Sequence, residues 1–355
     1  MRTGIIEPEI NGMWQVVHDS GELLSAVTTY SITGLKGDTD IEYQLIVRGV
    51  NDYAGATDYG VTFNSDTGSN YGYQEIKGND STASASRNTS VTSISIGRAN
   101  AANELFFSKT HIFAKSGKER TILTMKTQDI SETTVSTIIK RGNIWNNTVD
   151  EITLITITGS TNALGVGTRI ILLKKVHNDI MKTGVLTPNK IEGTWERIYS
   201  NTITSATSSF SITGLEGNTD EVYKLITRIV NDESTPTYKM YFTSDTTNTN
   251  YGRQQLQPLS GSVAAASSIY LFMGYATATG QISHNEIFIY AKSGYVRTCL
   301  INIVGQLSGT TIPRLHLAGV TWNNTSSEFT SMDLTCNTAG GFGVGTVIEL
   351  YRLNL

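Results

Sequence analysis

The sequence predicts an all-β fold made of two tandem homologous β-sandwich domains of jelly-roll type, and three observations support this prediction. The same short motifs recur in the same order at an offset of about 177 to 181 residues. Segments rich in Thr, Tyr, Val and Ile, which favour strands, alternate with turns rich in Gly, Asn and Ser. No segment shows an apolar period of about 3.6 residues over the length of a helix.

The repeat covers nearly the entire chain, and its period identifies the repeating unit as a whole domain. Solenoid repeats have periods of roughly 20–50 residues, far shorter than this one. We therefore expect a first module with an N-terminal arm at 1–176, a linker or second arm at 177–186, and a second module at 187–355. The motif pairs are Thr3-Gly4-Ile5-Ile6 with Thr183-Gly184-Val185-Leu186, Ser31-Ile32-Thr33-Gly34-Leu35 with Ser211-Ile212-Thr213-Gly214-Leu215, Ala114-Lys115-Ser116-Gly117 with Ala291-Lys292-Ser293-Gly294, Trp145-Asn146-Asn147-Thr148 with Trp322-Asn323-Asn324-Thr325, and Gly165-Val166-Gly167-Thr168 with Gly343-Val344-Gly345-Thr346.

The expected strands follow turn signals along each module, beginning after a Gly-(Asp/Asn)-Thr-Asp turn at 37–40 and 217–220. Roughly eight to ten strands are expected per module, with one short helical turn within 101–105. Each module is too long for a seven-stranded immunoglobulin unit, which favours a jelly roll. The clearest strands are Glu42–Arg48, Val91–Ile96, His111–Lys115, Arg120–Thr127, Glu151–Thr158 and Arg169–Lys175, and then Val222–Arg228, Ser268–Met273, Phe288–Lys292, Val296–Val304, Glu328–Thr335 and Val347–Leu353.

Composition excludes several classes of partner. The net charge is −4 over 355 residues, whereas nucleic-acid-binding proteins normally carry a basic stripe. No apolar run approaches the roughly 20 residues that span a membrane. Because the repeat already begins at Thr3, we expect no signal peptide. We therefore expect no nucleic-acid or membrane partner and synthesis in a cytoplasm.

The two cysteines, Cys299 and Cys336, both lie in the second copy, where the first copy has Ile122 and Gly159. Because one copy folds without them, we expect free thiols rather than a disulfide framework.

The four tryptophans form two matched pairs, Trp14 with Trp195 and Trp145 with Trp322. They could form an aromatic platform for sugars, but packing of a large ring against a sheet is the favoured interpretation.

Two pairs of arginines also recur, and we expect them to be buried or interfacial ion-pair partners rather than anion-binding groups. They are Arg48 with Arg228 and Arg120 with Arg297.

One repeated loop offers candidate ligand-binding residues. Asp, Asn and Tyr side chains on a loop can bind sugar hydroxyls or calcium, but any Asx-turn loop uses the same residue types. A weaker calcium candidate is the turn at 37–40, where the second copy has Asn218. We therefore predict no metal and no cofactor. The candidate glycan-binding residues are Asp66, Asn70 and Tyr71 in the first copy and Asp245, Asn250 and Tyr251 in the second.

The sequence gives no support for catalysis. The five histidines show no metal-binding spacing, and His111 is matched by Phe288 in the other copy. No nucleophile elbow, phosphate loop or dinucleotide fingerprint occurs, and no pair of carboxylates recurs as a glycosidase dyad would. We therefore expect a protein that is not an enzyme.

The combined motifs resemble uncharacterised virion structural proteins of tailed bacteriophages, of the tandem β-sandwich decoration or fibre type. The resemblance covers nearly the whole chain, but it carries no active-site residues with it. The motifs are Gly34–Asp40, Asn70–Gln74, Ala114–Gly117, Trp145–Thr148 and Gly165–Thr168, each with its second-copy partner.

This resemblance implies a location in the virion after synthesis in the host cytoplasm. The implied function is capsid decoration, an auxiliary role or a surface projection, through contacts with itself and other virion proteins. The alternative is a tail adhesin that binds a host-surface carbohydrate through the two repeated loops. We also expect the N-terminal arm to lie on a neighbouring subunit as an added strand; the alternative is that it completes the sheet of its own module.

Overall fold

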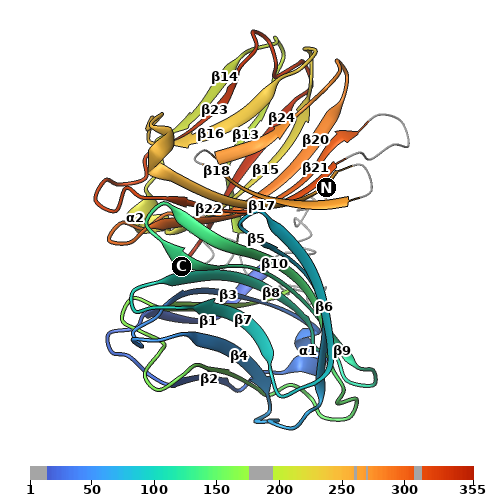
Figure 1. The fold of residues 1–355 in the computed structure, drawn as a ribbon, viewed down its shortest axis with the longest axis vertical. Helices are drawn as coiled ribbons and strands as arrows, with labels where there is room; N and C mark the ends of the chain where they lie inside the picture. Colours follow the sequence, from blue (N-terminus) through green and yellow to red (C-terminus); the bar gives the residue numbers. More distant parts are fainter. Residues whose placement is uncertain (1–13, 176–194, 260–261, 269–270, 308–313) are drawn as a thin grey trace, which may run out of the picture.

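The computed structural model describes residues 14–175, 195–259, 262–268, 271–307 and 314–355. The predicted N-terminal arm at Thr3–Ile6 and the linker at 177–186 lie outside these residues. Almost all regular structure is antiparallel β-strand, which confirms the predicted all-β class (Figure 1). We refer to 14–175 as the first half and to 195–355 as the second half. In the described part of the chain, no helix has the length and apolarity to cross a bilayer.

The two halves contain corresponding series of elements. The first half has β1 (Trp14–Glu22), β2 (Thr29–Thr33), α1 (Gly37–Asp40), β3 (Glu42–Val50), β4 (Thr57–Phe63), β5 (Tyr71–Asn79), β6 (Thr82–Val91), β7 (Ile94–Ala99), β8 (Leu105–Phe113), β9 (Arg120–Ser131), β10 (Thr134–Trp145), β11 (Leu154–Thr158) and β12 (Arg169–Lys175). The second half has β13 (Trp195–Thr202), β14 (Ser209–Thr213), α2 (Gly217–Asp220), β15 (Val222–Val230), β16 (Thr237–Phe242), η1 (Asn248–Asn250), β17 (Tyr251–Leu259), β18 (Ser262–Ser268), β19 (Leu271–Tyr275), β20 (Ile282–Tyr290), β21 (Arg297–Leu307), β22 (Arg314–Trp322), β23 (Ser331–Cys336) and β24 (Val347–Leu353).

Eight strands of the first half pair in the order that defines a jelly roll. The larger sheet has the order β1-β12-β3-β8-β9-β10-β5-β6, and the smaller has the order β2-β11-β4-β7. Without β5, β6, β9 and β10, the remaining strands pair first with last, second with second-last, and so on inwards. This is the pairing of a two-sheet jelly roll. The hairpins β5–β6 and β9–β10 widen one of its sheets from four strands to eight.

The second half has the same strand order. Its sheets are β13-β24-β15-β20-β21-β22-β17-β18 and β14-β23-β16-β19, so each strand has its counterpart at the equivalent place. This agrees with the sequence repeat, which predicts one strand order for both copies.

Strand β3 is central to the first half because both of its faces are buried. Tyr43, Leu45 and Val47 enter the core between the two sheets. Ile46 points the opposite way and enters a third cluster, formed between the halves. A strand buried on both faces carries a near-continuous apolar run rather than a clean alternation, as Leu45-Ile46-Val47 does.

The two eight-stranded sheets face each other and join the halves. Ile46, Phe107 and Ile138 of the first half share one buried cluster with Phe288 and Leu300 of the second. The four-stranded sheets lie on the outside, at opposite ends of the long axis of the molecule (Figure 1). The order of layers is therefore small sheet, large sheet, large sheet, small sheet.

Ion pairs supplement this apolar junction. Arg169 of the first half pairs with Glu221 of the second. Lys109 Nζ lies 3.4 Å from Glu286 Oε1 and 3.6 Å from the ring centroid of Phe288. Burial lowers the pKa of Lys109 to about 8, although the neighbouring Glu286 carboxylate opposes the shift. The halves therefore make both apolar and charged contacts with each other.

Three local expectations from the sequence are wrong. Residues 101–105 form no helical turn, because Asn103 has a left-handed backbone (φ 66°) that a right-handed helix cannot include. The short helical turns are instead α1 and α2, at the positions predicted as simple turns. The strand expected at 91–96 is interrupted at 92–93, where the chain crosses from the large sheet to the small one. Each half also has more strands than expected, because of the two added hairpins.

Candidate ligand site

The structure brings the three candidate residues of the first repeated loop together around one carboxylate. Asp66 Oδ2 accepts a hydrogen bond from Trp145 Nε1 at 2.7 Å and from Asn70 Nδ2 at 3.0 Å. Asp66 Oδ1 accepts from the backbone N–H of Gly68 at 3.0 Å. The Tyr71 hydroxyl donates to the backbone carbonyl of Asp66 at 3.1 Å. All of these bonds stay within the loop or tie it to the buried indole.

The second copy repeats this arrangement. Asp245 Oδ2 accepts from Trp322 Nε1 at 2.8 Å and from Asn250 Nδ2 at 2.8 Å. The Tyr251 hydroxyl donates to the backbone carbonyl of Asp245 at 2.9 Å. We call the group Asp66, Asn70, Tyr71 and Trp145, and its counterpart Asp245, Asn250, Tyr251 and Trp322, the indole clamp.

The hydrogen bonds of the clamp also stabilise the charged form of its carboxylates. Partial burial acts to raise the pKa of Asp66, but the bonds from Trp145, Asn70 and Gly68 outweigh it and leave that pKa lowered. The pKa of Asp245 is lowered by the same balance, against the effect of burial. A carboxylate that accepts several hydrogen bonds inside the protein has few lone pairs left for a ligand.

The geometry of the clamp favours a structural role over the predicted glycan role. The rings of Tyr71 and Tyr251 are buried in the cores of their halves and cannot stack on a sugar. Trp145 and Trp322 are fully buried beside them. This agrees with the packing interpretation of these tryptophans, and Trp195 likewise packs in the cluster between the halves.

The repeated arginines are buried, but their bonding differs from the prediction. Arg48, Arg120 and Arg297 have no more than 1% of their surface exposed, and their hydrogen bonds go to backbone carbonyls. The guanidinium of Arg48 also lies 3.8 Å from the ring centroid of Tyr295. Arg228 is half-buried and donates to a carbonyl at 3.3 Å. The predicted carboxylate partners are replaced by backbone carbonyls and aromatic rings, which a planar guanidinium can also bind.

Both cysteines are free, as predicted. Cys299 is fully buried, and burial raises the pKa of its thiol. Within the described ranges, no three His, Cys, Asp or Glu side chains are grouped closely enough to hold a metal ion.

The first half carries a polar network on the inner face of its added hairpins. Glu75 on β5 and Arg141 on β10 are paired cross-strand residues whose side chains form a buried ion pair. Glu75 also accepts from Ser86 Oγ at 2.8 Å, and the Arg141 guanidinium lies 3.9 Å from the ring centroid of Tyr73. Burial acts to raise the pKa of Glu75, but these bonds and the Arg141 charge leave it lowered.

Lys126 on β9 extends this network. Its ammonium donates to Ser95 Oγ at 2.6 Å, and its side chain is almost completely buried. Burial, and then the like charge of Arg141, lowers the pKa of Lys126 to about 7, although Glu75 opposes the shift.

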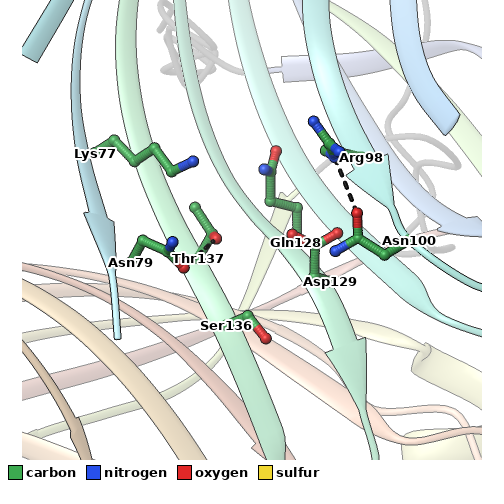
Figure 2. Close-up of a pocket in the computed structure, with 8 residues that line it drawn as sticks. All are labelled: Lys77, Asn79, Arg98, Asn100, Gln128, Asp129, Ser136 and Thr137. Carbon is green, nitrogen blue, oxygen red and sulfur yellow. Dashed lines mark hydrogen bonds between the residues drawn. The ribbon is translucent and has the colours of Figure 1, made fainter. Parts of the chain in front are cut away.

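Next to this network lies a polar pocket of about 270 Å³ (Figure 2). It is formed where β5, β9 and β10 approach the end of β7, and every side chain in its lining is polar or charged. The lining residues of the polar pocket are Lys77, Asn79, Arg98, Asn100, Gln128, Asp129, Ser136 and Thr137.

The polar pocket has a buried floor and an exposed rim. Gln128, Asp129 and Thr137 are between 2% and 8% exposed, whereas Arg98 and Asn100 are exposed. Gln128 Oε1 and Asp129 Oδ1 are buried and accept no hydrogen bond from the described residues. Buried acceptors normally receive a hydrogen bond from the protein or from water, so these two atoms can accept one from a molecule that enters the pocket.

A β-bulge in β9 places Asp129 in this floor. The register between β8 and β9 shifts between Leu105 and Phe107, and Asp129 has φ 53°. Bulges redirect a side chain and are over-represented beside functional sites. Burial, and then the charge of Glu104, raises the pKa of Asp129 to about 6, although Arg98 opposes the shift.

The second copy has a different residue at every position of the polar pocket. A register shift recurs between β20 and β21, so the backbone feature is shared while the side-chain chemistry is not. The replacements, in the order of the lining residues given above, are Gln257, Leu259, Tyr275, Thr277, Gly305, Gln306, Pro313 and Arg314.

The sequence interpretation missed the polar pocket because it concentrated on residues that the two copies share. The indole clamp is identical in both copies, as expected of a group that the fold itself needs. The signal for the pocket is the opposite one: polar residues of the first copy that the second copy replaces. Examples are Asn79, replaced by Leu259, in the pocket and Lys126, replaced by Ile303, in the adjoining network.

Comparison with known proteins identifies no family for this chain: no family model and no curated protein matches it. Solved structures give weak likenesses. Domains LG4-5 of the mouse laminin alpha1 chain share 8% identity, with 95% of this chain and 90% of that chain covered and a TM-score of 0.16. The PBSX exported protein XepA shares 8% identity, with 98% of this chain and 89% of that chain covered and a TM-score of 0.17. A chain in the structure of infectious bursal disease virus, Gx strain, shares 11% identity, with 95% of this chain and 81% of that chain covered and a TM-score of 0.14. Likenesses at these TM-scores carry no weight for fold or function.

Proposed function

We propose that the chain is a non-enzymatic structural subunit of a tailed-phage particle, as a capsid decoration or auxiliary protein or as part of a surface projection. The observation that supports this proposal is that the two halves form one block with the same type of polar face at each end. The motif resemblance points in the same direction. The modules at 1–176 and 187–355, with the linker at 177–186, are the units of this proposed design.

The two end faces are formed by the small sheets. In β2, Thr29, Ser31 and Thr33 are exposed, and in β14 the equivalent Ser209, Ser211 and Thr213 are exposed. Figure 1 places these sheets at opposite ends of the molecule. Small polar side chains on an exposed sheet suit repeated protein contacts of modest strength.

A block with two equivalent faces can bridge two neighbours at once. Linking two weak contacts raises their joint affinity through effective concentration, without any new contact. We therefore propose copies of the chain itself and other virion proteins as its partners, and the virion as its location.

A sedimentation experiment tests this proposal. Purified chain is mixed with phage particles that lack it, or with host cells, and the bound fraction is measured. We expect saturable binding to the particles. Binding to cells alone would refute the particle role and favour the second candidate function, a host-surface adhesin that recognises a glycan.

The second candidate function is favoured by the polar pocket, not by the loops from which it was first inferred. The clamp carboxylates are engaged with Trp145 and Trp322, whereas the floor of the pocket offers buried acceptors without partners among the described residues.

A further inference from the structure

We propose that the polar pocket binds a single sugar unit carrying one anionic group, either a carboxylate or a phosphate. This inference rests on the second candidate function, glycan recognition, and adds to it a ligand class and a set of binding residues. None of these residues belongs to the repeated loops.

The size of the polar pocket limits its ligand. Its volume of about 270 Å³ is close to the lower limit of roughly 300 Å³ for small-molecule sites. One sugar ring suits such a space, and a longer chain would have to continue outside it past the exposed rim.

The floor of the pocket calls for hydrogen-bond donors. Gln128 Oε1 and Asp129 Oδ1 are buried acceptors that no described group satisfies. A buried acceptor left without a donor destabilises the protein, so a ligand that supplies donors gains affinity there. Sugar hydroxyl groups are suitable donors, because each can donate one hydrogen bond and accept others.

The rim of the pocket calls for an anion. Lys77 projects from β5 toward the centre of the group, and Arg98 lies across from it beside Asn100 (Figure 2). Arg98 Nε donates to Asn100 Oδ1 at 3.1 Å, which holds the guanidinium at the rim. Cations bind carboxylate and phosphate by charge-assisted hydrogen bonds, which are stronger than neutral ones. The anionic group therefore lies toward Lys77 and Arg98, and the hydroxyl groups lie toward the floor.

The pocket lining contains no aromatic ring, so recognition depends on hydrogen bonds and charge rather than on stacking. The second copy retains the strands and the register shift with entirely different residues at these positions. The fold therefore does not require the polar set, which leaves recognition as its role.

The test measures binding of free sugars to the full chain by isothermal titration calorimetry and saturation-transfer NMR. The ligands are glucuronate, glucose 6-phosphate, glucose and inorganic phosphate. We expect one of the two anionic sugars to bind at least tenfold more tightly than glucose and than phosphate. The variant Lys77→Gln/Arg98→Gln should weaken this binding at least tenfold. The control Lys118→Gln/Arg87→Gln removes the same charge from exposed positions and should leave the affinity unchanged.

Three outcomes would overturn the inference. They are no binding of either anionic sugar, binding of glucose as tight as that of the anionic sugar, and the same loss of affinity in the pocket variant and in the control variant. Tight binding of phosphate alone would reduce the pocket to a simple anion site and would also refute it. Circular dichroism of both variants confirms that they are folded. Because free sugars are used, sugar binding without cell binding would reject the adhesin role and leave the ligand site standing.

Discussion

Replacing Asp66 by Ala should destabilise the protein by about 2–3 kcal/mol. The substitution removes the acceptor of the Trp145 indole N–H. The distance from Trp145 Nε1 to Asp66 Oδ2 is 2.7 Å, and the indole ring is fully buried. A hydrogen bond to a charged group contributes about 1.5–3 kcal/mol, and a buried donor left unsatisfied costs a similar amount. Asn70 and Gly68 are exposed and regain water, so their lost bonds add little.

The assay is urea unfolding followed by tryptophan fluorescence and circular dichroism. Asp245→Ala should cost the same, because its clamp has the same bonds in the second half. Asp66→Asn keeps one carbonyl acceptor and should cost about half as much. The control Glu119→Ala removes an exposed carboxylate and should stay within about 0.5 kcal/mol of the parent protein. If Asp66→Ala behaves like this control, the structural interpretation of the clamp is wrong.

The destabilisation caused by Asp66→Ala should become smaller in acid. The pKa of Asp66 is lower in the folded protein than in the unfolded chain, so its charge stabilises the fold fully above the unfolded pKa of about 3.9. This contribution disappears as the pH falls through the lower folded pKa. The stability difference between parent and Asp66→Ala should therefore be constant from pH 7 to about 5 and shrink below about 4. A difference that grows in acid would contradict the argument.

Three further predictions concern the polar network, the junction and the thiols. Glu75→Ala leaves its arginine partner buried without a counter-charge and should cost about 3–5 kcal/mol in urea unfolding; a cost below about 1 kcal/mol would contradict the buried pair. A Cβ on Gly319 would overlap a threonine side chain of the other half, whereas one on Gly142, at the matched position, meets nothing within 4 Å. Gly319→Ala should therefore lower the free energy of unfolding by about 1–3 kcal/mol and increase hydrogen exchange at the junction. Equal effects of Gly319→Ala and Gly142→Ala would show that the halves do not pack this way. A thiol reagent should label Cys336 in the folded protein and Cys299 only after unfolding, while a disulfide under non-reducing conditions would contradict the free thiols.

The sequence predicted the fold class, the repeat and several strand bounds, because these depend on local patterns. The final strand of the first half, Arg169–Lys175, has the predicted bounds. Strand β6 (Thr82–Val91) was missed because most of its residues are exposed and polar, so it lacks the alternation that marks a half-buried strand. Its position comes from pairing with β5, which is a tertiary contact that a local pattern does not encode.

The candidate site was less predictable than the fold. The residues of the indole clamp were found, but their role depends on the hydrogen bond that the Trp145 indole N–H donates to Asp66, a residue distant in sequence. The polar pocket joins residues from four strands and the loop after β7. One of them, Asp129, reaches the pocket through a bulge that no residue in the sequence signals. Such a site requires the strand order and the register, which only the structure supplies.

The most direct test of the proposed function is to locate the chain on the phage particle. Antibodies against the purified protein, detected by immunogold electron microscopy on purified particles from infected cells, should label the capsid or a surface projection at regular positions. Label that stays in the soluble fraction of the infected cells, with none on the particles, would contradict the account.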